Sequence, residues 1–170
     1  MKNHLFLFLC FAIAGWGACK DENKPDFCNN GVLDSQAGET EIDCGGPCEA
    51  CPPTATLTAT LAGFSYVASD INGQMSGSAI GIYTYGTSGT SIQFSFVGTD
   101  LDTPLPITDA EFYDSNDTYT KELSDTGSVT LTSIDAVRKI VSGRFSFSGT
   151  RNFDVMRKTV QNGQFANVRY

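Results

Sequence analysis

The sequence predicts an all-β fold: an antiparallel β-sandwich, with an open barrel as the alternative, preceded by a small disulfide-rich module. Three observations lead to this prediction. From residue 54 onward, short runs alternate apolar and polar side chains with the period of half-buried strands, and no stretch has a convincing helical period. Glycines and other turn-forming residues separate these runs. Four cysteines lie close together in the segment before them.

The strand-like runs follow one another at short intervals. Residues 54–61 alternate Thr with Ala or Leu, and in residues 91–97 the large apolar side chains share one face. Asn162 and Gly163 separate the last two runs, and because both residues tolerate a positive φ, this pair predicts a hairpin with a type I′ turn. The other runs with strand character are 64–68, 79–85, 128–134, 140–148, 155–161 and 164–170.

Residues 99–127 interrupt this regular series. They are rich in Asp, contain two prolines and have only weak periodicity, which predicts a long excursion with a short strand around residues 110–113. Because long loops often carry recognition, Phe112, Tyr113 and Tyr119 could be presented to a sugar or protein ligand. The alternative is that these aromatic rings only hold the loop against the sheet.

The N-terminal residues have the pattern of a secretory signal peptide, with a basic tip, an apolar run at residues 5–14 and small residues after it. This apolar run is too short to span a bilayer, which needs about 20 residues. A Gly-Ala pair stands directly before Cys19, and this ending resembles the lipobox of bacterial lipoproteins, although Trp16 occupies the position where that family usually has Leu. The resemblance implies that residues 1–18 are removed and that Cys19 carries acyl chains such as palmitate. The alternative is an ordinary cleaved signal that leaves Cys19 as a free thiol.

The residues after the predicted lipid site suggest a second address. Lys20-Asp21-Glu22 resembles the short tag that follows the acylated cysteine in Bacteroidota-type surface lipoproteins. That resemblance implies a lipid-anchored protein of the outer membrane, exposed at the cell surface. The alternative is that residues 19–27 are simply a polar, flexible tether.

Four cysteines define a compact segment, residues 28–53, which ends at a stiff Pro-Pro pair. An even number of cysteines in an exported protein predicts two disulfides, whose three possible pairings the sequence leaves open. A zinc site with four thiolates is disfavoured, because the spacing is not that of paired C-x2-C motifs. The segment therefore forms a stapled stalk before a β domain at residues 54–170. Its cysteines are Cys28, Cys44, Cys48 and Cys51.

This stalk resembles a small C-x-N-G…E-T-x-x-D-C-G-G-x-C-x-x-C module found beside β-rich domains of secreted bacterial proteins. Four of its side chains, Asn30, Asp34, Glu39 and Asp43, offer the oxygen ligands that calcium prefers. The spacing is not that of an EF-hand. The alternative is that these side chains bond to the backbone in turns. No cofactor other than this structural calcium is expected.

Parts of the β domain are also similar to a known group. Residues 128–135 and 141–147, with the Asn-Gly pair near the C-terminus, resemble the closing half of uncharacterised Bacteroidota-type lipoprotein domains. The resemblance implies a β-sandwich of unknown function, and it supplies no chemistry.

The charge is acidic overall, with a formal net charge of -8, and this disfavours nucleic acid as a partner. Residues 70–135 are rich in acids, whereas residues 138–170 are rich in Arg and Lys. The basic residues could form a face that binds a polyanion such as an acidic glycan or lipopolysaccharide. The alternative, which we favour, is that acidic and basic strands pair and neutralise each other across the sheet.

The sequence does not predict an enzyme. Its only histidine, His4, lies in the signal peptide, so the mature chain lacks the commonest general base and metal ligand. A glycosidase-like carboxylate pair remains formally open, but its acids have no flanking motif. We therefore expect a non-enzymatic binding role, with a glycan or a surface protein as the ligand. The alternative is a structural envelope protein or a small subunit of a surface assembly. The acids concerned are Asp100, Asp102, Asp109 and Glu111.

Overall fold

The computed structural model describes residues 25–51, 53–122, 125–151 and 156–170. The chain divides into two compact units, and the second begins at Pro52. The predicted signal peptide, Cys19 and the Lys20-Asp21-Glu22 tag lie outside the described residues. Within the described ranges, no helix has the length and apolar character needed to cross a membrane.

The stalk module is held by two disulfides, as the sequence predicts. Cys28 bonds to Cys48 and Cys44 bonds to Cys51, which selects one of the three pairings that the sequence leaves open. The module contains two short 3-10 helices, η1 (Asp26–Asn29) and η2 (Ser35–Ala37). Its Cys-Gly-Gly sequence has a steric reason: Gly46 has a φ of 58°, and a Cβ there would lie 2.1 Å from the Gly38 carbonyl oxygen.

The second unit is all-β, as predicted, and eight of its strands form a closed antiparallel barrel. In this up-and-down order each strand pairs with the next along the chain, β5 pairs with β7, and β9 returns to β1. The short strand β6 lies between β5 and β8. A 3-10 turn, η3 (Thr87–Gly89), joins β3 to β4. The strands are β1 (Thr56–Leu61), β2 (Phe64–Ser76), β3 (Ala79–Gly86), β4 (Ser91–Val97), β5 (Pro104–Tyr113), β6 (Thr118–Thr120), β7 (Gly127–Asp135), β8 (Ile140–Thr150) and β9 (Arg157–Arg169).

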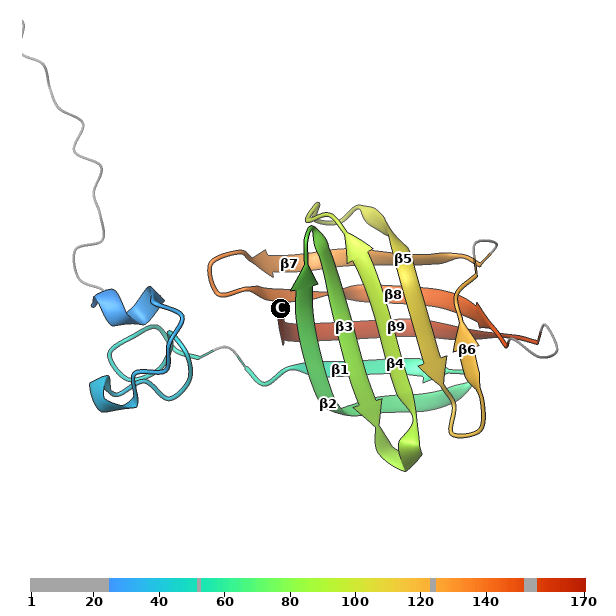
Figure 1. Ribbon diagram of the computed structural model, residues 1–170, viewed down its shortest axis with the longest axis horizontal. Coiled ribbons are helices and arrows are strands. Elements are labelled where there is room, and N and C mark those ends of the chain that lie inside the picture. Colours follow the sequence, from blue (N-terminus) through green and yellow to red (C-terminus); the bar gives the residue numbers. More distant parts are fainter. Residues whose placement is uncertain (1–24, 52, 123–124, 152–155) are drawn as a thin grey trace, which may run out of the picture. The chain divides into compact units, whose positions relative to one another are not determined.

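The predicted sandwich is not confirmed, because the sheet closes on itself: β9 pairs with β1, and β5 pairs with both β4 and β7. The barrel is flattened into two layers: the main part of β2 lies with β3, β4 and β5 in a front layer, and β7, β8, β9 and β1 form a back layer whose strands cross them steeply (Figure 1). Strand β2 passes between the layers. Its first residues pair with β1, and after a register shift between Ala68 and Asp70 the rest pairs with β3. Such an irregularity lets a strand turn the corner of a barrel.

The predicted hairpin at Asn162-Gly163 is wrong, because strand β9 runs through both residues without a turn. The register of β9 against its neighbours shifts here, as in a β-bulge. Asn162 has a φ of 52°, and a bulge uses a positive φ as readily as a turn does. A Cβ at Gly163 would lie 2.5 Å from the Phe145 ring, so this position also requires the absence of a side chain.

The predicted excursion at residues 99–127 is wrong in large part, because it contains β5, a strand of 10 residues. Pro104 and Pro106 stand at its start, where a missing N–H is best tolerated. Phe112 and Tyr119 are fully buried and stack with their ring centroids 4.9 Å apart. The alternative interpretation is confirmed for these two rings, which fix the segment to the core and are not available to a ligand.

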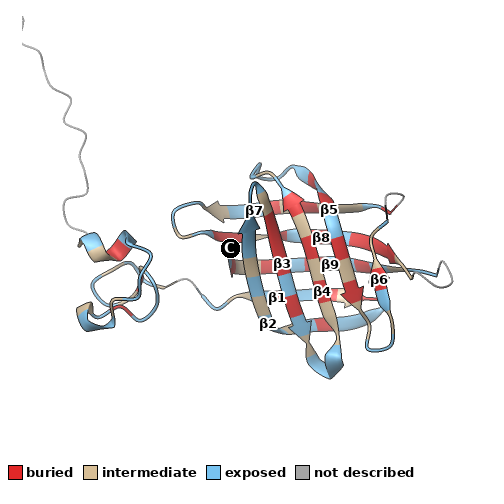
Figure 2. Ribbon diagram, viewed as in Figure 1, coloured by how far each residue is buried: buried red, intermediate tan, exposed pale blue. Residues whose placement is uncertain are grey.

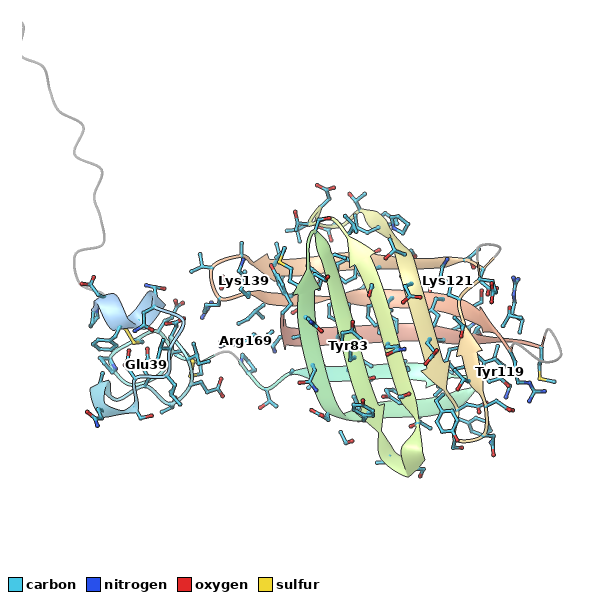
Figure 3. The ribbon with its side chains drawn as sticks, in the orientation of Figure 1. Glu39, Tyr83, Tyr119, Lys121, Lys139 and Arg169 are labelled. Atoms are coloured by element: carbon cyan, nitrogen blue, oxygen red, sulfur yellow. A yellow bond between two sulfur atoms is a disulfide. The ribbon has the colours of Figure 1, made fainter. Side chains whose placement is uncertain are left out.

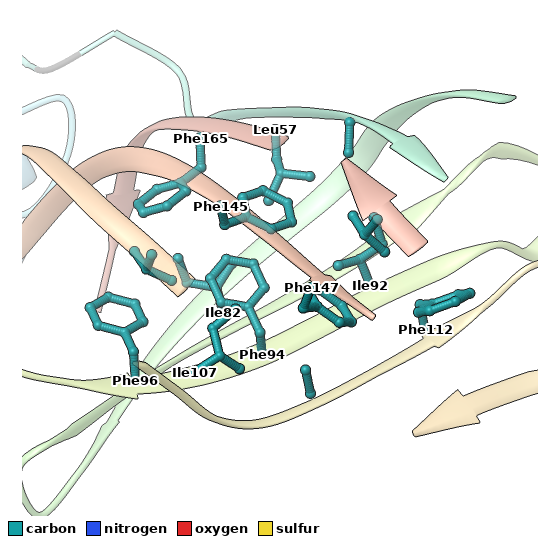
Figure 4. Close-up of a cluster of buried hydrophobic side chains, with 14 of the residues drawn as sticks. Leu57, Ile82, Ile92, Phe94, Phe96, Ile107, Phe112, Phe145, Phe147 and Phe165 are labelled. Atoms are coloured by element: carbon teal, nitrogen blue, oxygen red, sulfur yellow. The ribbon is translucent and has the colours of Figure 1, made fainter. Parts of the chain in front are cut away.

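The barrel interior is packed with aromatic and aliphatic side chains. Buried and exposed residues alternate along most strands (Figure 2), so one face of each strand points inward. Phe94 lies at the centre of the aromatic group, and its ring centroid is 4.4 Å from that of Phe145 (Figure 4). Phe96, Phe147 and Phe165 surround this pair. These side chains fill the barrel centre, so a ligand could bind only at the ends of the barrel or on its outer face.

The aromatic packing predicts a large stability difference between two phenylalanines. Phe94 is 2% exposed, and Phe94→Ala should lower the free energy of unfolding by about 3–5 kcal/mol because it leaves a cavity. Phe64 is 78% exposed, and Phe64→Ala should change it by less than about 0.5 kcal/mol. Urea unfolding followed by far-UV circular dichroism measures the free energy of unfolding of both variants. Equal losses in the two variants would contradict the packing described here.

The disulfide pairing predicts which cysteine replacements expose new thiols. Replacing a bonded pair together, Cys28→Ser with Cys48→Ser, should add no free thiol relative to the wild type, because Cys44 and Cys51 remain bonded to each other. Replacing one cysteine from each bond, Cys28→Ser with Cys44→Ser, should add two. Thiol titration of the denatured, unreduced proteins counts them. Two additional thiols in the first double variant would refute this pairing.

Candidate functional site

The four predicted calcium ligands in the stalk bond to other groups of the module. The Asp43 carboxylate accepts hydrogen bonds from the backbone N–H groups of Asn30 and Gly31 at 2.8 and 3.0 Å. The Asn30 side-chain amide donates to Asp34 at 2.7 Å, and Glu39 accepts from the Asp34 N–H at 2.7 Å. These contacts are those of the turn-forming alternative. Calcium stays a hypothesis, and an ion would have to compete with these donors.

The four carboxylates considered for catalysis lie in two different parts of the barrel. Asp109 and Glu111 lie on the outward face of β5, where Glu111 accepts a hydrogen bond from the Gln93 amide at 3.2 Å. Asp100 and Asp102 lie in the connection between β4 and β5 and are exposed.

One end of the barrel contains a cavity of about 490 Å³, here called the barrel-end cleft. Three connections line it, those between β1 and β2, β3 and β4, and β5 and β6, together with Lys158 of β9. Tyr119 marks this end in Figure 3. Phe64 and Val67 add exposed apolar surface to the wall. By shape alone, the cleft is a candidate for a binding site.

The charged groups of the barrel-end cleft are, however, bonded within the protein. Lys158 Nζ lies 2.6 Å from an Asp114 carboxylate oxygen and 4.9 Å from the centroid of the Tyr119 ring. The hydroxyls of Tyr66 and Thr84 are 2.7 Å apart and bonded to each other. These contacts stabilise the loops that they join, and they occupy both charged groups of the cleft.

The electrostatics of the cleft favour a permanently charged pair. Burial on its own would raise the pKa of the Asp114 carboxyl, but the hydrogen bond from Lys158 and those from two backbone N–H groups outweigh it and lower the pKa. The hydrogen bond to Asp114, above all, raises the pKa of the Lys158 ammonium. Both groups therefore remain charged at neutral pH.

Four ion pairs within the described residues join the acidic segment to the basic one, but in each of them at least one partner lies in a connection. Neutralisation is therefore confirmed for these pairs, whereas pairing of charged strands across the sheet is not. Arg157 bonds to the buried Asp125 at 2.5 Å, and Asp125 also accepts hydrogen bonds from Ser148 and Thr150. The other pairs are Lys158–Asp114, Arg151–Asp117 and Arg138–Asp135.

A second cavity, of about 510 Å³, lies on the outer face of the back layer and is here called the β7–β9 groove. Strand pairing sets its polar side chains in rows. Thr130, Arg144 and Gln164 are register partners across three strands, and Ser128 is opposite Ser146. The bulge in β9 adds two further side chains, and Phe145 and Gly163 complete the lining. The polar lining residues are Ser128, Thr130, Arg144, Ser146, Gln161, Asn162 and Gln164.

The polar side chains of the groove differ from the two charged side chains of the cleft, which are bonded to each other. None of the seven makes a side-chain hydrogen bond or ion pair with any residue in the described part of the chain. Arg144 in particular has no carboxylate partner there, in contrast to the four basic residues paired above. Their donors and acceptors face solvent and are available to a ligand. We therefore take the β7–β9 groove as the candidate site.

Sequence reasoning did not find this groove. The alternation in residues 140–148 predicts a strand with Arg144 and Ser146 on one face, but it does not show which residues of the neighbouring strands lie beside them. The signal that could have found it is the run of Ser, Thr, Gln and Arg at the outward positions of the last three strands. The register that joins them depends on bulges, which the sequence does not locate.

The fold and the groove define a closed, side-chain-filled β-barrel module with a polar groove on its outer face. Over residues 54–169 the chain matches the family described as a domain of unknown function, DUF6252, and it belongs to that family. No curated protein and no solved structure matches the chain. The match agrees with the expected uncharacterised domain, and it adds no chemistry.

The ion pairs predict that stability falls in acid. Burial would raise the pKa of the Asp125 carboxyl, but hydrogen bonds from the Glu122 N–H and Thr150, and the Arg157 charge, outweigh it and lower the pKa. At a pH between the lowered pKa of Asp125 in the folded protein and its ordinary pKa in the unfolded chain, the unfolded chain therefore binds more protons. The stability from this carboxylate is fully present above a pH of about 4 and is lost as the pH falls through the folded value.

Urea unfolding at pH 6 and pH 3 tests this dependence. Asp125→Asn should be less stable at pH 6 and should lose less stability on acidification than the wild type. Asp100→Asn is the control, because Asp100 is exposed and makes no hydrogen bond or ion pair within the described ranges. The explanation fails if Asp125→Asn retains the full wild-type dependence on pH.

Proposed function

We propose that this protein is a lipid-anchored lipoprotein of the outer membrane, exposed at the cell surface, whose barrel is a non-enzymatic binding module. The β7–β9 groove carries the proposal of a binding role, because its seven polar side chains make no bonds to one another or to other described residues. The Gly-Ala-Cys19 ending and the Lys20-Asp21-Glu22 tag support the address. The disulfide-bonded stalk would then separate the barrel from the lipid.

The charged groups of the barrel support binding over catalysis. A general acid needs a carboxyl with a raised pKa, whereas Asp114 and Asp125 have lowered pKa values and are fixed in ion pairs. The single histidine precedes Cys19 and would leave with the signal peptide.

The alternative, a structural envelope protein or a small subunit of a surface assembly, receives less support. Strand addition to an open sheet edge is a common mode of assembly. Each of the eight barrel strands already has a neighbour on both sides. Recognition through side chains on the outer face is therefore the better-supported mode of contact.

Protease treatment and palmitate labelling of intact cells that express the tagged full chain test the proposed surface exposure and lipid anchor. The wild type should be cleaved from unbroken cells and should incorporate labelled palmitate. Cys19→Ala should lose the label and the membrane fraction. If the wild type resists protease until the outer membrane is broken, surface exposure is refuted; if it takes up no label, the lipid anchor is refuted.

Mild-detergent extraction distinguishes a binding module from an assembly subunit. A binding module should be purified as a single chain in its micelle. Stoichiometric partner proteins that survive gel filtration would favour the assembly role.

A further inference from the structure

Acidic residues are unevenly divided between the two layers of the barrel. Strands β1, β8 and β9 contain no Asp or Glu, and β7 contains only Asp135, which pairs with Arg138. Strands β2 and β5, which lie in the front layer (Figure 1), carry Asp70, Asp109 and Glu111 on their outward faces. In a chain with a formal net charge of -8, the strands of the back layer therefore offer an anion a surface of low local repulsion.

Arg144 occupies the middle strand of the groove on this layer. Its row runs from Thr130 through Arg144 and Gln164 to Thr58 on β1, all joined by strand register. Asp102 lies beside β7, since its N–H bonds to the Leu131 carbonyl, but it does not line the groove. The Arg144 guanidinium is thus a lone positive charge among neutral hydrogen-bonding groups.

The residue types restrict the chemistry of the ligand. A guanidinium presents its N–H groups in a planar fork that matches a carboxylate in two parallel hydrogen bonds. Ser and Thr hydroxyls and Gln and Asn amides both donate and accept, as the hydroxyls of a sugar ring do. A lipid would find few apolar side chains in this groove, and a nucleic acid would require several cations. A neutral sugar would leave the charge of Arg144 unused.

We propose that the β7–β9 groove binds an acidic saccharide, with Arg144 pairing with the carboxylate of one sugar unit and the surrounding hydroxyl and amide side chains bonding to its ring hydroxyls. This inference rests on the binding role proposed above and names the class of ligand. The volume of about 510 Å³ lies in the range of small-molecule sites. Because the groove is open along the outer face, it suits a unit within a longer glycan chain.

Calorimetry on the purified full chain, with two matched pairs of probes, tests the proposal. Trigalacturonate is compared with its methyl ester, which keeps the hydroxyls but removes the charge, and sialyllactose is compared with lactose. At least one acidic probe should bind about tenfold or more tightly than its neutral match, because the neutral match lacks the carboxylate that would accept charge-assisted hydrogen bonds from Arg144. Glucose 6-phosphate and inorganic phosphate separate a carboxylate site from a phosphate site.

Two arginine variants localise the binding. Arg144→Gln should weaken the acidic probe about tenfold or more, and a double variant, Ser146→Ala with Gln164→Ala, should weaken it less. Arg169→Gln is the control, because it removes the same charge from an exposed position on β9 outside the groove (Figure 3). Thermal unfolding confirms that each variant is folded.

The inference is overturned if neither acidic probe binds, if the neutral probes bind equally well, if phosphate compounds bind more tightly, or if Arg144→Gln and Arg169→Gln behave alike. These outcomes are separable from the address, because the purified chain is tested in solution. Binding of an acidic probe by a protein that resists protease on intact cells would leave the ligand class standing and refute surface exposure alone.

Discussion

The packing of aromatic rings inside the barrel is the constraint on which the rest of the structure depends. Phe94, Phe145 and Phe165 come from three strands and meet at the centre, so the inward face of each strand is committed to the core. Closing the sheet around these rings removes apolar area from water and gives each of the eight barrel strands a neighbour on both sides. The consequence for function is direct: with the centre filled, a ligand has only the ends of the barrel and its outer face.

The sequence predicted most of the strands because alternation is a local property that burial of one face imposes. It did not predict closure, since the pairing of β9 with β1 joins residues far apart in the chain. It mistook the bulge at Asn162-Gly163 for a turn, because both need a positive φ. Nothing within that dipeptide tells the two apart; the difference lies in Phe145, whose ring occupies the space beside Gly163.

The candidate site was harder to predict than the fold for the same physical reason. Four clustered cysteines predicted two disulfides, but the pairing depends on the path of the loop between them. The groove exists only when β7, β8 and β9 lie in the observed register, with Thr130, Arg144 and Gln164 in one row. The aromatic residues that the sequence offered as ligand contacts proved instead to be core, because Phe112 and Tyr119 gain more from stacking in the interior than from exposure.

An acidic protein can hold an anion only where its own charges are distant or screened. The two layers of a barrel pack about 10 Å apart, and at physiological ionic strength exposed charges are screened beyond about 8 Å. The outward acids of β2 and β5 point away from the opposite layer, so their repulsion at the groove is weak. Strands β8 and β9 contain no Asp or Glu, so no carboxylate on these two strands competes with a ligand for the guanidinium of Arg144. Ion pairs fix Arg151, Arg157 and Lys158 within the fold, whereas Arg144 has no ion pair within the described residues, so its charge stays available.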